Sequence, residues 1–324
     1  MHWRLMALIR AGKGLFPPPP PHPGYLRLHR HLGNLHRSRI DPTSKLRIGF
    51  EICRHIARFG KSPVGATFFE IGTGWRLNVP IACWLCGADR VVTVDLNSLL
   101  SGAIISEDLL FFRRNEQELF NRLRSEFGDL ILADRWRRLI QLAAADLTIA
   151  EVCDVLHIEY VAPADAAQTH CDSQSIDFHI SCNVLEHISE ELLGGIFREA
   201  RRITRPSGLL VHRVDHSDHF SHADRALPAI HFLRYDDTQW NRYAGNRYAY
   251  VNRLREDDYL HVFRGCGLAV GTVSSEPDET VVRLLQDGCP IHGRFRGKTH
   301  DTLARLKSLF VLMPDTTIGT ITGA

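Results

Sequence analysis

The sequence predicts an α/β fold with a mostly parallel sheet and helices on both faces. Short apolar runs typical of buried strands alternate with segments of helical spacing along most of the 324 residues. The segments 66–71, 79–87 and 90–95 form a β-α-β pattern with short connections, which places the two strands parallel in one sheet. A glycine turn, residues 72–74, follows the first strand, and glycine there lets the backbone approach a ligand closely.

The other elements follow from the same patterns. Residues 97–157 are mostly of helical character and longer than a crossover requires, so we predict a helical insertion or cap there. Helices are also predicted over 44–59, 190–203 and 257–265, and strands over 158–165, 175–188, 208–215, 268–276 and 309–315.

The N-terminal residues differ from the rest of the chain. Pro17 to Pro21 cannot join a helix or a central strand, so residues 1–42 are predicted to form a basic, proline-rich arm that runs over the surface. The predicted organisation is an arm over 1–42, one domain over 43–315 with insertions at 97–157 and 216–256, and a flexible tail over 316–324.

Charge is spread unevenly along the chain. Residues 1–60 hold 11 Lys and Arg against 2 Asp and Glu, a balance of +9, while the remainder holds 28 against 35, a balance of −7. Such an arm could contact nucleic acid or an anionic membrane, but a solvated cover that docks on the acidic body is favoured. We therefore expect no nucleic-acid partner.

The cysteines and the apolar segments indicate a cytoplasmic protein. The eight cysteines are scattered and do not form the framework of a small secreted domain. The first 16 residues, with an apolar run interrupted by Arg4, Arg10 and Lys13, make a poor signal peptide, and no apolar segment is long enough to span a bilayer. A homo-oligomer is possible.

The acid before the glycine turn bears on the ligand. A dinucleotide site would place a third glycine at position 77, where the sequence has Leu77. The Glu70 carboxylate would repel a pyrophosphate but suits a ligand that carries positive charge. S-adenosyl-L-methionine is such a ligand, because it has an ammonium group and a sulfonium. Asp95 ends the second strand, where an acid can accept both ribose hydroxyls.

Five stretches then carry a family resemblance: FFEIGTGW, VVTVDLN, APADAAQ, IDFHISCNVLEHI and GLLVHRVD, in this order over about residues 64–216. They resemble the successive motifs of class I S-adenosylmethionine-dependent methyltransferases. The resemblance implies a Rossmann-like, seven-stranded sheet whose last strand is antiparallel. The sequence departs from the family at Arg76, where many members have a glycine.

The expected cofactor-binding residues follow from the chemistry of the acidic side chains and from the family resemblance together. The resemblance implies that Glu70 and the turn surround the methionine part, that Asp95 meets the ribose and Asp165 the adenine, and that two residues after the fourth strand line the cofactor. Separately, each acid could instead cap a helix or lie in a turn or solvated loop. The expected cofactor-binding residues are Glu70, Gly72, Thr73, Gly74, Asp95, Leu96, Asp165, Ala166, Asn183 and Val184.

Two histidines are candidate catalytic bases, because a base is needed when the methyl acceptor must lose a proton. His187 follows the fourth strand and His216 the fifth, on the substrate side of such a fold. His187 could equally make a hydrogen bond at a helix start. The run His212, Asp215, His216, Asp218, His219 and His222 has the composition of a metal site, but its spacing is not diagnostic. A polar substrate loop is favoured, and no metal is expected.

The sequence therefore predicts an S-adenosylmethionine-dependent methyltransferase that acts on a small metabolite or glycan precursor, with an oxygen as the favoured acceptor atom. Residues 225–255, rich in aromatic residues, arginine and asparagine, are predicted to form the acceptor pocket. Aromatic and arginine side chains so interleaved can also bind single-stranded nucleic acid, which the acidic body disfavours. The alternatives are a non-catalytic S-adenosylmethionine-binding protein and an NAD(P)-dependent oxidoreductase.

Overall fold

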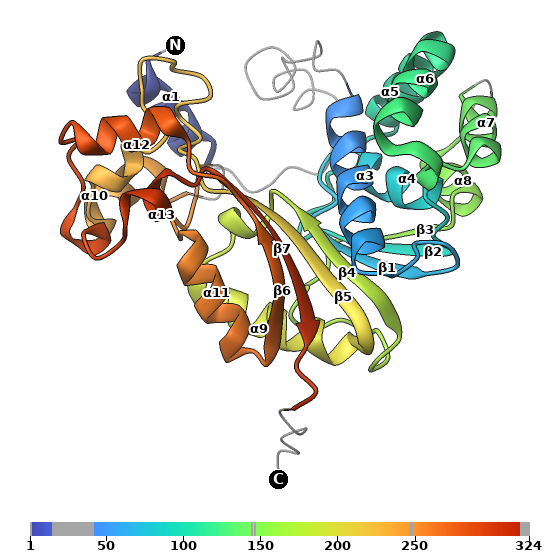
Figure 1. The fold of residues 1–324 in the computed structure, drawn as a ribbon. Coiled ribbons are helices and arrows are strands. Elements are labelled where there is room, and N and C mark those ends of the chain that lie inside the picture. The colour runs from blue at the N-terminus through green and yellow to red at the C-terminus, as the bar shows by residue number, and fades with distance from the viewer. Residues whose placement is uncertain (1, 15–41, 144, 146, 247–248, 318–324) are drawn as a thin grey trace. The chain divides into compact units, whose positions relative to one another are not determined.

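The chain divides into two compact units (Figure 1). The computed structural model describes residues 2–14, 42–143, 145, 147–246 and 249–317. We call Pro19–Cys182 with Glu199–Val211 the N-terminal unit. The C-terminal unit is Met1–Pro18, Asn183–Arg198 and His212–Ala324.

The strands form one seven-stranded sheet in the order β3-β2-β1-β4-β5-β7-β6. Its bounds are β1 (Thr67–Ile71), β2 (Arg90–Val94), β3 (Ile158–Val161), β4 (Ile176–Cys182), β5 (Thr204–Asp215), β6 (Leu268–Ser274) and β7 (Lys307–Pro314). β1 pairs in parallel with β2 and β4, and β2 with β3, whereas β7 pairs antiparallel with β6. The predicted fold class, with an antiparallel last strand, is confirmed.

Helices surround the parallel strands of the N-terminal unit. They are α3 (Thr43–Arg58), α4 (Asn78–Leu85), α5 (Gly102–Arg114), α6 (Glu116–Phe127), α7 (Ala133–Leu142) and α8 (Ile149–Val155), with the 3₁₀ turn η2 (Gly128–Leu130). α3 packs against α4, and α4 contacts β2. Phe68 of β1 and Phe178 of β4 are buried in register with their ring centroids 5.0 Å apart, which ties these two strands into the core.

The C-terminal unit contains mostly short helices. They are α1 (Trp3–Gly14), η3 (Leu185–His187), η4 (His231–Arg234), α10 (Asp237–Ala244), α11 (Glu256–Gly265), α12 (Glu279–Gln286), η5 (Gly293–Phe295) and α13 (His300–Ala304). α9 (Glu190–Ile203), which matches its predicted bounds, contains residues of both units. Within the described part of the chain, no helix has the length and apolar character that a membrane span requires.

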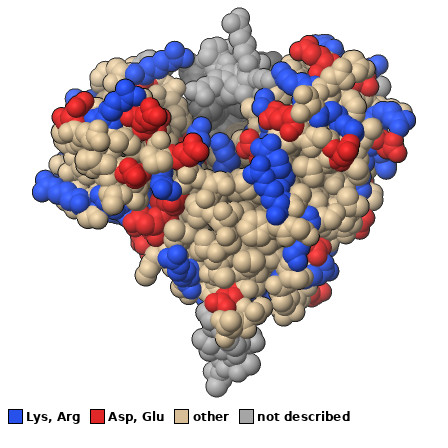
Figure 2. All heavy atoms as spheres, in the orientation of Figure 1, with Lys and Arg blue, Asp and Glu red and all other residues tan. Residues whose placement is uncertain are grey.

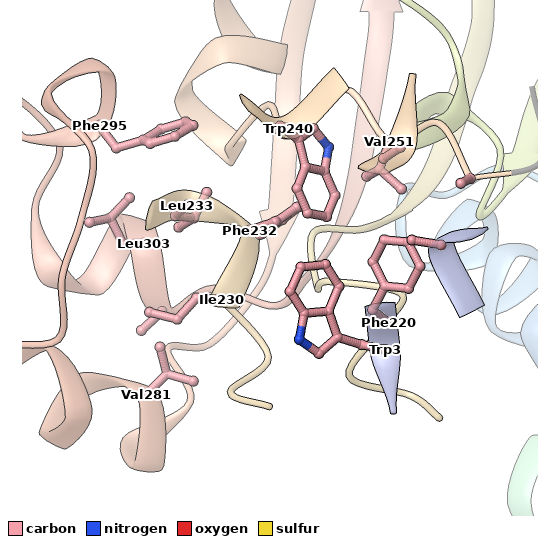
Figure 3. Packing of buried hydrophobic residues seen from close by; sticks show 14 of the residues in the cluster. Trp3, Phe220, Ile230, Phe232, Leu233, Trp240, Val251, Val281, Phe295 and Leu303 are labelled. Atoms are coloured by element: carbon pink, nitrogen blue, oxygen red, sulfur yellow. The ribbon is translucent and has the colours of Figure 1, made fainter. Parts of the chain in front are cut away.

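The first residues of the chain differ from the predicted arm, because residues 3–14 form the helix α1. Trp3 is 5% exposed and lies in a cluster of buried apolar residues of the C-terminal unit (Figure 3). Its indole makes edge contacts with His231 and Tyr243 at centroid distances of 4.9 and 4.8 Å. The gain from burying a tryptophan explains why this end is anchored. The proline run and residues 318–324 of the predicted tail lie outside the described residues.

Two strands are shorter than predicted by four residues or more. β3 ends at Val161, before Pro163, which has no N–H group to continue a ladder. β4 ends at Cys182, because Asn183 has a φ of +54°, a left-handed conformation that asparagine tolerates better than most residues. The LEH sequence, which the apolar pattern predicts as strand, forms η3 instead.

Charges of both signs lie on the surface that Figure 2 shows. Lys and Arg side chains are interspersed there with Asp and Glu side chains. Several charged side chains of the C-terminal unit form ion pairs, for example Arg294 with Asp237 and Lys298 with Asp257. Such a surface has the mixed character of an ordinary solvated face.

Candidate functional site

The glycine turn lies directly after β1 in the N-terminal unit. Gly72 and Gly74 have φ angles of +84° and +66°, a region that other residues adopt only with strain. The Gly72 N–H donates to the Val94 carbonyl of β2 over 2.8 Å. The turn therefore stays against the end of β2, as a close approach of backbone to ligand requires.

Asp95, at the end of β2, connects three loops. Its Oδ2 accepts the Gly74 N–H at 2.8 Å, and its Oδ1 accepts the Asn97 N–H at 2.9 Å. Its backbone carbonyl accepts the N–H of Ala164, in the loop after β3, at 2.9 Å. The loops that follow β1, β2 and β3 thus meet at one aspartate.

The loop after β3 carries the predicted adenine residues. Asp165 is exposed, and its Oδ1 accepts the Ala167 N–H at 2.8 Å, while Ala166 is buried. Leu96, beside Asp95, is 71% exposed, which is unusual for a large apolar side chain. An exposed leucine next to Asp95, the predicted ribose ligand, is consistent with a surface that a ligand covers.

Glu70 lies beneath the turn and is only 3% exposed. Its Oε2 accepts the Thr93 hydroxyl, and Thr93 Oγ1 lies 2.6 Å from Thr73 Oγ1, so a chain of hydrogen bonds joins the acid to the turn. Burial raises the pKa of Glu70 to about 8, although the Thr93 hydrogen bond and the charge of Lys45 act in the opposite direction. Glu70 is thus linked to the glycine turn through the hydroxyl groups of Thr93 and Thr73.

Arg76, the residue that departs from the family, is paired. Its guanidinium forms an ion pair with Asp108 of α5, whose side chain is almost fully buried. Burial raises the pKa of Asp108, and Arg76 opposes that shift. The arginine therefore turns toward α5 and fixes the end of the glycine loop to that helix.

The two predicted residues after β4 belong to the C-terminal unit. The Asn183 N–H donates to the Arg213 carbonyl at 2.8 Å, and the Arg213 guanidinium donates to Asn183 Oδ1 at 3.0 Å. These bonds fix Asn183 and Val184 beside the end of β5. The other eight predicted cofactor residues lie together in the N-terminal unit.

The two candidate catalytic histidines have different surroundings. His187 is exposed, and its Nδ1 lies 2.9 Å from the Tyr250 carbonyl, so Nδ1 carries the proton and Nε2 the lone pair. His216 is 2% exposed, and its two ring nitrogens contact the Leu254 carbonyl and Ser308 Oγ. Burial lowers the pKa of His216 to about 3. The geometry favours a structural role for His216.

The histidine-rich run after β5 separates into residues with different partners. His212 packs edge-on against Phe197, and Asp218 Oδ2 lies 3.1 Å from His231 Nδ1. Asp215, His219 and His222 instead come together, and His219 also meets Glu186 and His187 of η3. Sequence reasoning missed Glu186. The signal was present, since LEHI and VDHSDHF follow consecutive strands that the sheet order places side by side.

One protein-family model matches part of the chain. Residues 116–212 match the family model of a methyltransferase domain. The matched range contains β3 and β4 with the loops that follow them, whereas the glycine turn and Asp95 precede it. No curated protein matches the chain.

Solved structures give distant likenesses. A geranyl diphosphate methyltransferase in complex with SAM is 15% identical, with 91% of this chain and 92% of that chain covered and a TM-score of 0.43. Geranyl diphosphate C-methyltransferase from Streptomyces coelicolor A3(2), bound to Mg²⁺, geranyl diphosphate and S-adenosyl-L-homocysteine, is 14% identical (91% and 86% covered, TM-score 0.44). An S-adenosylmethionine-dependent methyltransferase from Mesorhizobium loti is 13% identical (80% and 96% covered, TM-score 0.40). These values are too low to assign the acceptors of those proteins to this chain.

The chain therefore contains a region that matches a methyltransferase domain, and its sheet has the mostly parallel order with an antiparallel last strand that the motifs predicted. The matched domain agrees with the cofactor expected from the sequence, S-adenosyl-L-methionine.

Proposed function

We propose that the protein transfers a methyl group from S-adenosylmethionine to a small polar acceptor, with an acceptor oxygen as the favoured site. The observation that carries the proposal is the meeting of three loops at Asp95 in the N-terminal unit. Because two backbone N–H groups hold this carboxylate, it is oriented in advance, and its remaining lone pairs suit the two ribose hydroxyls. The exposed Asp165, held by its own turn, suits the adenine amino group.

The predicted cofactor residues divide into contacts and supports. We assign Gly72, Gly74 and Asp95 to direct contact with the cofactor, through backbone approach and carboxylate oxygens. Glu70 acts through Thr93 and Thr73, so we assign it as a positioning residue that fixes the turn. Asn183 and Val184 stay proposed cofactor residues on the basis of the family resemblance.

The acceptor belongs, in this proposal, to the C-terminal unit. A cavity of about 310 Å³ lies there, and most of its lining comes from the predicted insertion 216–256. Its polar lining suits a small hydroxylated or charged metabolite. Residues on its wall include Glu190, Asn241, Tyr250, Asn252 and Arg294.

Methyl transfer itself needs little covalent help, because the sulfonium is an activated donor and the enzyme chiefly orients the acceptor. Of the two predicted bases, His187 is the one whose exposed ring carries its lone pair on Nε2. We therefore place His187 on the acceptor side. A histidine there can take a proton from an acceptor that must be deprotonated, or can bind a metal ion.

Calorimetric titration with S-adenosylmethionine and, separately, NADH tests the proposal. The wild type is expected to bind the sulfonium cofactor and not NADH. Asp95→Ala should weaken binding about 100-fold, since hydrogen bonds to a charged group contribute about 1.5 to 3 kcal/mol each. Asp172→Ala, an exposed acid of the same unit, is the matched control and should bind as the wild type does.

Each other result has a definite meaning. Binding of NADH alone would favour the oxidoreductase alternative. Cofactor binding without turnover across a panel of hydroxylated acceptors would favour the non-catalytic binding protein. Equal affinity of Asp95→Ala and wild type would remove the loop arrangement as the cofactor site.

A further inference from the structure

Five side chains with metal-ligating atoms gather in the C-terminal unit, outside the glycine-turn loops. One trio is Glu186, His187 and His219, and the other is Asp215, His219 and His222. Within each trio the potential ligand atoms all lie within 4.8 Å of one another. His219 belongs to both trios, so we call the five residues the histidine cluster.

Contacts inside the C-terminal unit bring the two contributing segments together. The hydrogen bond from the Asn183 N–H to the Arg213 carbonyl holds the start of the segment after β4 against the end of β5. The ring of His219 then lies with its centroid 5.0 Å from that of His187 and 5.0 Å from that of His222. The His219 ring thus lies between an imidazole of its own segment and one of the segment after β4.

Two buried carboxylates belong to the histidine cluster. Glu186 is 1% exposed and Asp215 is 8% exposed. A buried carboxylate costs free energy unless a cation or several hydrogen bonds compensate it. A divalent cation bound by either trio would neutralise the carboxylate of that trio and use the lone pairs of its two imidazoles at once.

Outer hydrogen bonds orient the ligands, as they do in metal sites. The Tyr250 carbonyl fixes the His187 tautomer that leaves the lone pair on Nε2. The N–H and hydroxyl of Ser217 both donate to Asp215 Oδ1, at 2.9 and 2.5 Å. Asp215 Oδ2 is the other oxygen, and it lies 3.9 Å from His222 Nε2. His222 Nε2 donates to Ser217 Oγ at 2.8 Å, so this nitrogen would release its proton on binding an ion. Both ligand types are therefore held by backbone or hydroxyl groups.

We propose that the histidine cluster binds one divalent first-row transition ion, with His219 as the central ligand. Each trio offers two imidazoles and one carboxylate, a donor set that suits Zn²⁺, Fe²⁺ or Co²⁺ better than Mg²⁺. Ligands about 2.1 Å from such an ion lie at most about 4.2 Å apart, so shifts of about half an ångström would complete either trio.

The proposal changes the role of His187. A nitrogen that coordinates a metal cannot accept a proton at the same time, so His187 becomes a ligand in place of a general base. A bound divalent ion lowers the pKa of a coordinated hydroxyl or water. The acceptor class that follows is a molecule with an oxygen donor. This use of the ion rests on the proposed function, but metal binding itself does not.

Metal binding alone tests the inference. The full-length protein is treated with a chelator, desalted and titrated with Co²⁺, whose visible absorption reports its ligands, and with Zn²⁺ in competition. The wild type should bind one equivalent, and His219→Ala should lose at least 100-fold in affinity. His261→Ala, an exposed histidine on α11, is the matched control and should bind as the wild type does.

Folding is checked by the affinity of His219→Ala for S-adenosylmethionine. His187→Ala and His222→Ala alter exposed side chains and keep the test decisive if His219→Ala misfolds. Weakened binding in either variant supports the inference and identifies the trio used. Absence of stoichiometric binding by the wild type overturns it, as does wild-type affinity in all three cluster variants. Neither result bears on cofactor binding, so the two proposals fail separately.

Discussion

The glycine-turn loops of the N-terminal unit and the histidine cluster of the C-terminal unit hold their carboxylates in different ways. Asp95 is oriented by backbone N–H groups within a few residues of two strand ends. Glu186 and Asp215 are buried among imidazoles that two distant segments supply. The first arrangement suits an organic ligand with hydroxyl groups, and the second suits an ion. The difference shows that acids in one protein can indicate different ligands.

The largest expected effect comes from removing the anchor of α1. Trp3→Ala should destabilise the C-terminal unit by about 4 kcal/mol, because a buried aromatic side chain is lost from a packed cluster. Denaturant unfolding followed by circular dichroism measures the change. Leu8→Ala, on the same helix but 70% exposed, should change stability by less than about 0.5 kcal/mol. Comparable losses in both variants would contradict the anchoring role of the indole.

The next effect concerns the N-terminal unit. Arg76→Ala should reduce the free energy of unfolding by about 3 kcal/mol, because Asp108 would stay buried without its cation. Replacing both residues with leucine should restore most of the loss, since the buried charge is then gone. Urea titrations of both variants provide the test. Co²⁺ affinity should not change, and a change would mean that the two sites are coupled.

A smaller effect concerns the protonation of Glu70. Its folded-state pKa of about 8 lies above the ordinary carboxyl value, so its contribution to stability is present at low pH and is lost as the pH rises through about 8. The charged groups that face it are Lys45 and Asp95. A tenfold difference in proton affinity between the folded and unfolded states corresponds to about 1.4 kcal/mol.

Glu70→Gln isolates this effect, because glutamine keeps the shape and does not titrate. Unfolding measured from pH 5 to pH 9, at about one-unit intervals, should show stability falling with pH in the wild type more steeply than in the variant. Parallel profiles would show that Glu70 is ionised in the folded protein at neutral pH.

The smallest effect concerns the acceptor cavity. Asn241→Trp should raise the KM for the acceptor roughly fivefold, equivalent to about 1 kcal/mol, by filling part of the cavity. The affinity for S-adenosylmethionine should stay unchanged. Arg242→Trp places the same indole at the neighbouring exposed position of α10, outside the lining of the cavity, and serves as control. An equal KM in wild type and Asn241→Trp would move the acceptor elsewhere.

Local signals carried most of the fold prediction. The helix at 190–203 was predicted to the residue, and the glycine turn and Asp95 were found because a strand, a turn and an acid follow each other directly. β4 was overextended, because a single asparagine in a left-handed conformation ends it. Hydrophobic patterns carry no information on such backbone angles.

The histidine cluster depended on long-range contacts. The run from His212 to His222 was recognised by composition, but sequence spacing could not separate His212, His216 and Asp218 from the members that come together. His216 is fixed by Leu254 and Ser308, which are distant in the chain. Only the packing of distant segments determines which of the six His and Asp side chains of this run come together.

The anchoring of Trp3 has a consequence for synthesis of the chain. The Trp3 N–H donates to Asp224, 221 positions further along, and the rings that cover the indole come from the same distant region. At about 5 to 20 residues per second, a ribosome needs about 10 to 40 seconds to supply those partners. During that interval the Trp3 side chain lacks the residues that bury it in the folded protein. Holdase chaperones that recognise exposed aromatic residues therefore have time to bind it.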